Sequence, residues 1–261
     1  MAVERGDWDK ALDSRRADEA DIALKTVLRQ GNTGGSGAFL AFADGARYWV
    51  KPLNNLQHER VCVNDQIVGR AAARIGALTP TVRTARIPPE LAGCEFRGDH
   101  QLEEGIAHAS LAVNSAVEIN VLANRDKDDN ERHHAEFVAL FDWCWGGDAQ
   151  QWLVGQAAEE RCFSHDHGHY FPGGPGWTAA GLEANVDTPN VYSYGGTAFS
   201  QEVLNSVAGL LEAVSRKDLI SVLAAIPTSW PVTNAELETV GYFLERRAPD
   251  VAARLRARGQ P

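Results

Sequence analysis

The sequence predicts an α+β fold that is divided into two lobes. Its first half combines short apolar strand patterns and turn signals with one helical pattern, whereas its second half is mostly helical. The 261 residues, 44% of them hydrophobic, suffice for one large domain or for two small lobes with a sizeable core. A run of charged and amide residues at 124–130 separates the two patterns. We place the N-lobe at residues 1–118 and the C-lobe at residues 119–261.

The N-lobe is predicted to begin as a small antiparallel sheet. Residues 22–28 are expected to form a short strand or the edge of a helix, and a glycine-rich turn follows at 30–37. Strands at 38–42 and 47–51 then form a hairpin, because Asp44-Gly45 between them is a strong turn signal. The glycine-rich turn therefore lies beside a hairpin whose return strand ends in a lysine.

A helix is predicted over residues 59–75, where apolar side chains recur every four residues from Val63 to Ile75. Gly76 supplies its C-terminal cap. The rest of the N-lobe is expected to contain a strand at 82–87, a loop-rich segment at 88–109 and a further strand within 111–119.

The C-lobe is predicted to be mainly helical. A helix is expected at 131–145, and two short apolar segments at 152–154 and 161–163 favour a small hairpin. After a loop that follows Gly176, two amphipathic helices are expected at 201–226 and 234–256, separated by Pro227 and Pro231.

Composition excludes several classes of function. A net charge of −10 disfavours nonspecific binding to nucleic acid or to an anionic membrane surface. The chain has no apolar run long enough to span a membrane, and its charged N-terminus lacks a signal segment, so we expect a cytoplasmic protein. The four cysteines form no CxxC pair and are expected to be buried, reduced thiols.

One aspartate lies among three histidines in Ser164-His165-Asp166-His167-Gly168-His169. Two hypotheses explain this cluster. Histidine and aspartate side chains hold zinc or iron in metallohydrolases, and on a strand the alternating histidines would share one face. Alternatively, Asp166 holds a metal ion that arrives with a nucleotide. Gly168 interrupts strand geometry, which favours the second hypothesis.

The glycine-rich turn and Lys51 predict a phosphate-binding site. The turn is not a Walker A loop, because no Lys-Ser/Thr pair follows its glycines. Protein kinases instead cover the phosphates with backbone N–H groups of a glycine-rich loop and add a lysine from a neighbouring strand. We therefore consider Gly34, Gly35, Ser36 and Lys51 as candidate nucleotide-binding residues.

Three acids and an amide follow in an order that is typical of kinases. Asp65, or alternatively Glu59, lies on the helix after Lys51 and is available to hold that lysine. Further on, Asp148 in a glycine turn precedes Gln151 and an apolar strand, and Asp166 comes next. In kinases the first acid accepts the hydroxyl proton or orients the nucleophile, and the amide and second acid hold magnesium.

The whole chain from about residue 20 to 255 resembles the bacterial HipA-like kinases, a branch of the protein-kinase and phosphoinositide-kinase superfamily. The order and spacing of several segments carry the resemblance, and no single motif decides it. The matching segments are Tyr48–Pro52, Val63–Arg70, Gly105–Ser110, Gln151–Leu153, Ser164–His169, Ile226–Trp230 and Phe243–Arg247.

The resemblance implies a two-lobed protein-kinase-like fold and ATP-dependent phosphotransfer with Mg²⁺ to a hydroxyl of a protein Ser/Thr or a small molecule. Lys51 would bind the phosphates, Asp65 would hold Lys51, and Asp148 would be the catalytic aspartate. Gln151 and Asp166 would be the metal ligands. The expected partners are a nucleotide and a phosphoacceptor, with neither nucleic acid nor membrane.

Two departures from the family pattern keep other functions open. The family usually has glutamate at the position of Asp65, and Asp148-Ala149-Gln150-Gln151 shortens the usual Asp-Arg-His-x-x-Asn loop. One alternative is therefore a weak or inactive kinase fold that binds ATP as a scaffold. The other is the metallohydrolase that would use the histidines at 165–169.

Overall fold

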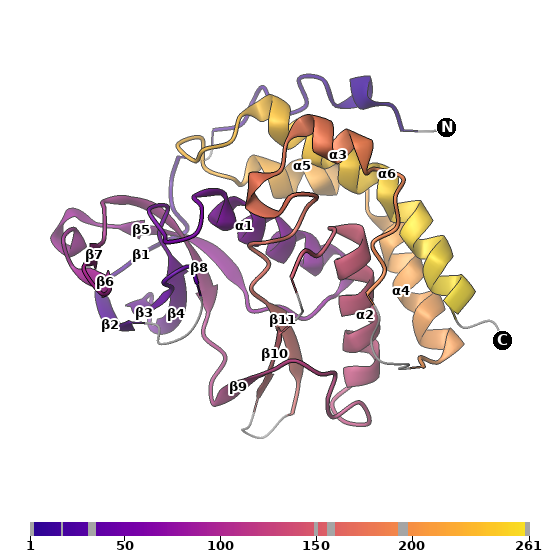
Figure 1. Cartoon of the computed structure of the whole chain (residues 1–261), viewed down its shortest axis with the longest axis horizontal. Coiled ribbons are helices and arrows are strands. Elements are labelled where there is room, and N and C mark those ends of the chain that lie inside the picture. Colours follow the sequence, from indigo (N-terminus) through magenta and orange to yellow (C-terminus); the bar gives the residue numbers. More distant parts are fainter. Residues whose placement is uncertain are drawn as a thin grey trace.

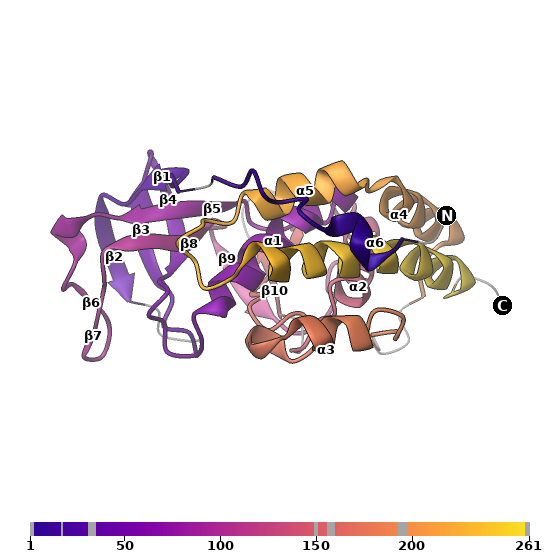
Figure 2. The same cartoon turned by 90° about the horizontal axis from the view of Figure 1, so that it is seen from above.

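A computed structural model of the chain describes residues 3–16, 18–30, 35–148, 151–155, 160–192 and 198–258. Figure 1 and Figure 2 show a strand-rich part at one end of the molecule, a helical part at the other end and helix α1 (Arg60–Ala72) between them. The predicted α+β class is confirmed by this mixture of sheet and helices.

The strand-rich part is a six-stranded sheet. Its strands lie in the order β1-β5-β8-β4-β3-β2. Neighbouring strands are antiparallel except for the two-residue pair of β1 with β5, which is parallel and corrects the expected all-antiparallel sheet. The strands are β1 (Ile22–Ala23), β2 (Thr26–Gln30), β3 (Phe39–Ala43), β4 (Ala46–Lys51), β5 (Val82–Ile87) and β8 (Gly105–Leu111).

The sheet curls so that its two edges approach each other. The backbone N–H of Leu24 donates to Arg86 of β5, and that of the next residue, Lys25, donates to Phe42 of β3, both at 2.9 Å. One short stretch of chain thus bonds to β5 and to β3, which lie near opposite edges of the sheet. Strands β6 (Glu95–Arg97) and β7 (His100–Gln101) form a separate two-stranded hairpin, and β6 contacts β2 of the six-stranded sheet.

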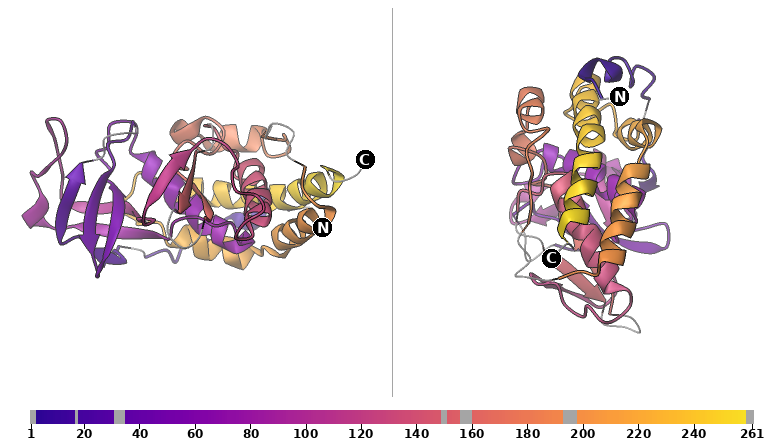
Figure 3. Two further views of the ribbon diagram at one scale, coloured as in Figure 1. Left: turned by 90° about the horizontal axis from the view of Figure 1, so that it is seen from below. Right: turned by 90° about the vertical axis from the view of Figure 1, so that its right-hand side faces the viewer.

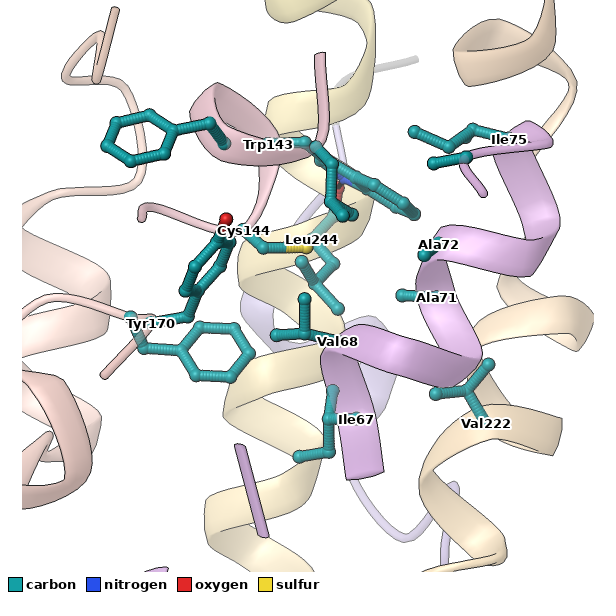
Figure 4. Close-up of a cluster of buried hydrophobic side chains, with 14 of the residues drawn as sticks. Ile67, Val68, Ala71, Ala72, Ile75, Trp143, Cys144, Tyr170, Val222 and Leu244 are labelled. Carbon is teal, nitrogen blue, oxygen red and sulfur yellow. Dashed lines mark hydrogen bonds between the residues drawn. The ribbon is translucent and has the colours of Figure 1, made fainter. Parts of the chain in front are cut away.

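Helix α1 joins the sheet to the helical part. A 3-10 turn at Ala73–Ile75 continues it, and Gly76 ends it with a φ of 74°, so the helix predicted over 59–75 is confirmed. Nearly every side chain of α1 is buried. Figure 4 shows Val68 and Ala71 of this helix facing a cluster that contains Trp143, Cys144 and Leu244.

In the described residues, the helical part contains five α-helices and a three-stranded sheet in the order β11-β10-β9. Helices α4 and α6 lie side by side, which Figure 3 shows from two directions. None of the described helices is long and apolar enough to cross a membrane. The elements are β9 (Ala116–Ile119), α2 (Asn130–Trp143), β10 (Gln151–Gly155), β11 (Cys162–His165), α3 (Ala179–Ala184), α4 (Gln201–Ala213), α5 (Arg216–Ala224) and α6 (Asn234–Arg258).

Two segments differ from the prediction. Strand β8 lies largely within 88–109, which we expected to be loop-rich, and the strand expected within 111–119 is the end of β8 followed by β9. The helix expected at 201–226 is two helices, because Ser215 accepts from the N–H of Asp218 and starts α5 with a capping box. All four cysteines are free thiols, but Cys94 is only half-buried.

Candidate functional site

A cavity of about 600 Å³ lies between the curled sheet, helix α1 and the three-stranded sheet. Strands β2, β3, β4 and β8 form one wall, and the linker after β8 forms another together with β9. This volume suits a small-molecule ligand or cofactor. The charged and imidazole side chains of its lining are Arg29, Arg47, Lys51, Asp65, His108, Glu118, His165, Asp166 and His167.

Strand β4 directs alternate side chains into the cavity. Arg47, Trp49 and Lys51 all line it, as the two-residue period of a strand requires. The guanidinium carbon of Arg29 lies 5.1 Å from the centre of the Trp49 ring, and Nη2 of Arg47 donates to Oδ1 of Asn114 at 2.7 Å. Trp49 thus adds an aromatic surface to the cavity wall that Lys51 also lines.

Lys51 joins two carboxylates at the end of β4. Its Nζ lies 2.7 Å from Oδ2 of Asp65 and 2.6 Å from Oδ1 of Asp166. Burial by itself lowers the pKa of Lys51, but the charges of the two aspartates outweigh it and raise that pKa above its ordinary value. The lysine therefore stays protonated. Lys51 and Asp166 are 115 residues apart in sequence, and the fold brings their side chains into contact.

Asp65 uses both of its oxygens. Oδ2 accepts from Lys51, and Oδ1 accepts from the backbone N–H of His167 at 2.8 Å. A cation and an amide together offset the cost of burying this carboxylate. An aspartate side chain is long enough to reach both partners, because α1 lies against the loop that follows Asp166. A Cβ atom at Gly168 would lie 2.5 Å from Cγ1 of Val61.

Asp166 directly follows β11 and has a φ of 60°, a left-handed conformation that is uncommon outside glycine. Its side chain lines the cavity and is 51% exposed. The positive charge of Lys51 lowers the pKa of Asp166, so the carboxylate is ionised. Lys51 binds Oδ1, so Oδ2 is an oxygen that this lysine does not use, of the kind that magnesium prefers.

The other predicted acid and the amide are placed differently. Asp148 is exposed and is not one of the described residues that line the cavity; its nearest oxygen lies 3.8 Å from Nδ1 of His169. The backbone of Gln151 lies opposite His165 in the β10–β11 pair, one residue from Asp166. The side chain of Gln151 lies outside the described part of the chain.

The glycine-rich turn is described from Gly35 onward, and the predicted contact residue Gly34 lies outside the described residues. Ser36 is buried and lines the cavity, whereas Gly35 does not belong to its lining. A Cβ atom at Gly35 would lie 2.5 Å from Nε2 of Gln57, so the turn packs closely on the segment that precedes α1.

The three histidines around Asp166 do not lie on one strand. Strand β11 ends at His165, whose Nε2 lies 3.9 Å from Oε1 of Glu118. His167 instead bonds through Nε2 to the hydroxyl of Ser164 at 2.9 Å, and burial lowers its pKa to about 4. Within the described ranges, no three His, Cys, Asp or Glu side chains are arranged to hold a metal ion. This arrangement does not favour the metallohydrolase hypothesis.

Several cavity residues were not predicted from the sequence. His108 lies opposite Lys51 on β8, and burial lowers its pKa to about 4. It was missed as a site residue because its strand was expected to be a loop. Glu118 and Arg29 carry no motif. They reach the cavity from two different sheets, Arg29 from β2 and Glu118 from β9. Trp49 was detectable, since it alternates with Lys51 on one predicted strand.

Comparison with known proteins finds a family and a solved structure that this chain resembles. Residues 24–148 match the sequence pattern of a family described as HipA-like kinase. Among solved structures, the proinflammatory kinase CtkA of Helicobacter pylori has a similar fold, with a TM-score of 0.57 at 11% sequence identity over 90% of this chain and 95% of that chain. No curated protein matches the sequence. The resemblance to HipA-like kinases and the kinase-like fold are thereby confirmed.

Proposed function

We propose that the protein is an ATP-dependent phosphotransferase that transfers the γ-phosphate to a hydroxyl group, and the match of residues 24–148 to the HipA-like kinase family supports this proposal. One observation carries this proposal. Lys51, Asp65 and Asp166 come from a strand, a helix and a distant loop, and they meet at a cavity large enough for a nucleotide.

We further propose that the chain works as two lobes, residues 1–118 and 119–261, with ATP bound between them. The phosphates would lie beside Lys51, and Ser36 and the neighbouring glycines would cover them. The nucleobase would lie against Trp49 and Leu153, which supply apolar surface in the same cavity. Asp65 keeps Lys51 in place through the 2.7 Å ion pair.

Asp166 is the proposed ligand of magnesium, with Gln151 as a second oxygen donor. Magnesium, when bound, neutralises charge that develops on the transferred phosphoryl group. Asp166 fits this role because it is ionised and presents an oxygen that Lys51 does not use. Asp148 would accept the proton of the attacking hydroxyl. Its exposed position leaves it reachable by a phosphoacceptor.

ATP binding with and without Mg²⁺ tests the proposal, with Asp166→Ala as the test variant. We expect the wild-type protein to bind ATP more tightly with Mg²⁺ than without it, and Asp166→Ala to lose that difference. Asp126→Ala, an exposed acid in the charge run, is a matched control that should behave as the wild type does. Equal binding with and without Mg²⁺ in the wild-type protein would contradict the assigned metal site.

A second candidate function is a kinase fold that binds ATP without transferring phosphate. The exposed position of Asp148, outside the described lining of the cavity, favours it. Mass analysis for phosphate on the protein and on candidate acceptors separates the two functions. Stoichiometric zinc or iron in the purified protein, together with no ATP binding, would instead support the metallohydrolase.

A further inference from the structure

Asn64 is fully buried on α1, one residue before Asp65, and its amide bonds to the segment that follows Asp166. Nδ2 donates to the backbone oxygens of Gly168 at 2.9 Å and Tyr170 at 3.0 Å. Oδ1 accepts from Nε1 of Trp177 at 2.9 Å. Only this orientation of the amide satisfies all three partners, because the two carbonyls need a donor and the indole needs an acceptor.

The same segment is fastened to α1 at two further points. Asp65 accepts from the N–H of His167, and the absence of a side chain at Gly168 lets the loop backbone approach Val61. Two consecutive residues of one helix turn, Asn64 and Asp65, thus bond to three backbone groups within residues 167–170. The backbone of the loop after Asp166 is therefore bonded directly to side chains of the helix.

Asp166 depends on such support from its neighbours. Its left-handed backbone is unfavourable for a residue with a side chain and persists only where the surrounding structure imposes it. Strand β11 fixes the chain up to His165, through the pairing of that residue with Gln151. The bonds from α1 begin at His167. Asp166 is therefore the single residue between two fixed stretches of backbone.

We propose that Asn64 is a positioning residue that holds Asp166 in the orientation required to bind the metal–nucleotide complex. This inference rests on the proposed function, in which Asp166 is the metal ligand. It also gives the cluster at 165–169 a physical explanation. The backbone N–H of His167 bonds to Asp65 of α1, the His167 ring bonds to Ser164 of β11, and Gly168 allows the loop backbone to approach Val61, so these two residues fasten the loop on either side of Asp166.

The test compares Asn64→Ala with Asn130→Ala. Asn130 is a matched control, because it is equally buried and its amide also makes two bonds to carbonyls, of Asn124 and Glu160, and accepts one from the N–H of Cys162. Both variants lose three hydrogen bonds, but only Asn64→Ala loses them at the loop after Asp166. Trp177→Phe, which removes the indole donor to Asn64 and keeps an aromatic ring at this buried position, replaces Asn64→Ala if that variant does not fold.

The first measurement is amide hydrogen exchange of the protein without ligand. In Asn64→Ala we expect exchange at residues 166–171 to accelerate roughly tenfold to a hundredfold, because two carbonyl partners of the loop are lost. In Trp177→Phe we expect a smaller acceleration at the same residues. In Asn130→Ala the acceleration should lie near residues 160–162. Unchanged exchange at 166–171 in both Asn64→Ala and Trp177→Phe would overturn the inference.

The second measurement is the gain in ATP affinity on adding Mg²⁺. If the loop is correctly placed in only one tenth of Asn64→Ala molecules, that gain falls about tenfold, whereas Asn130→Ala keeps it. A merely structural role predicts equal losses in both variants and would also overturn the inference. A wild-type protein that does not bind ATP would refute the proposed function alone, since the exchange data decide the role of Asn64 without any ligand.

Discussion

The ion pair between Lys51 and Asp65 offers the sharpest test of the site, through the variant Asp65→Asn. Asparagine keeps an oxygen for the N–H of His167 but removes the negative charge that faces Lys51. The lysine then retains only Asp166 as a partner, on a side chain that is half exposed. We expect a less stable protein in which Lys51 is less firmly placed.

The size of the effect follows from burial. The side chains of Lys51 and Asp65 are only 11% and 4% exposed, so solvent screens this pair weakly. Breaking a buried pair by removing one partner costs about 3–5 kcal/mol. Because Asp166 still compensates part of the charge of Lys51, we expect the free energy of unfolding to fall by roughly 2–3 kcal/mol.

Urea unfolding at pH 7 measures this loss, and ATP titration with Mg²⁺ measures its consequence for binding. Asp142→Asn is the control. Asp142 is equally buried and pairs with Arg247 and Arg254, away from the cavity, so its replacement should destabilise the protein without weakening ATP binding in folded molecules.

A double-mutant cycle with Lys51→Met isolates the pair itself. We expect a coupling energy between positions 51 and 65 of roughly 1–3 kcal/mol. A loss of less than about 1 kcal/mol in Asp65→Asn, or the same loss in the Lys51→Met background, would show that the pair contributes little and would refute the reasoning.

Two further predictions concern a buried histidine and a close approach of backbone. Burial lowers the pKa of His134 to about 4, so between pH 6.5 and 4 the unfolded chain takes up a proton that the folded protein does not bind. Stability therefore falls as the pH decreases, and His134→Leu should reduce the loss between pH 7 and pH 5 by about 2 kcal/mol in urea unfolding; an unchanged pH dependence would contradict this. Gly168→Ala places a Cβ atom 2.5 Å from Val61 and should lower the free energy of unfolding by about 1–3 kcal/mol in thermal or urea unfolding. The same variant should also weaken Mg²⁺-dependent ATP binding. Val61→Ala in the same chain should restore part of both, and no restoration would mean that the clash is not the cause.

Local sequence patterns determined much of this fold. The helix at 59–75 was predictable because its apolar residues recur with a helical period and Gly76 ends it, and the hairpin that carries Lys51 was predictable from Asp44-Gly45 and strand alternation. The kinase order of acids was visible for the same reason, since it depends only on residue type and spacing. Strand β8 was not predictable by alternation, because it lies in the middle of the sheet and four consecutive residues, Ile106 to Ala109, are buried.

Only the tertiary structure decided how the site is assembled. No local pattern indicates that Lys51 contacts Asp166 across 115 residues, or that Asn64 bonds to Gly168 and Tyr170. Such contacts arise from the packing of α1 between a curled sheet and a distant loop, and the free energy that fixes them is spread over residues far apart in the chain. The sequence by itself therefore determined which side chains were available for phosphate and metal chemistry. Their distances and partners were set by packing, because a periodic pattern reports which face of an element is buried and not what that face meets.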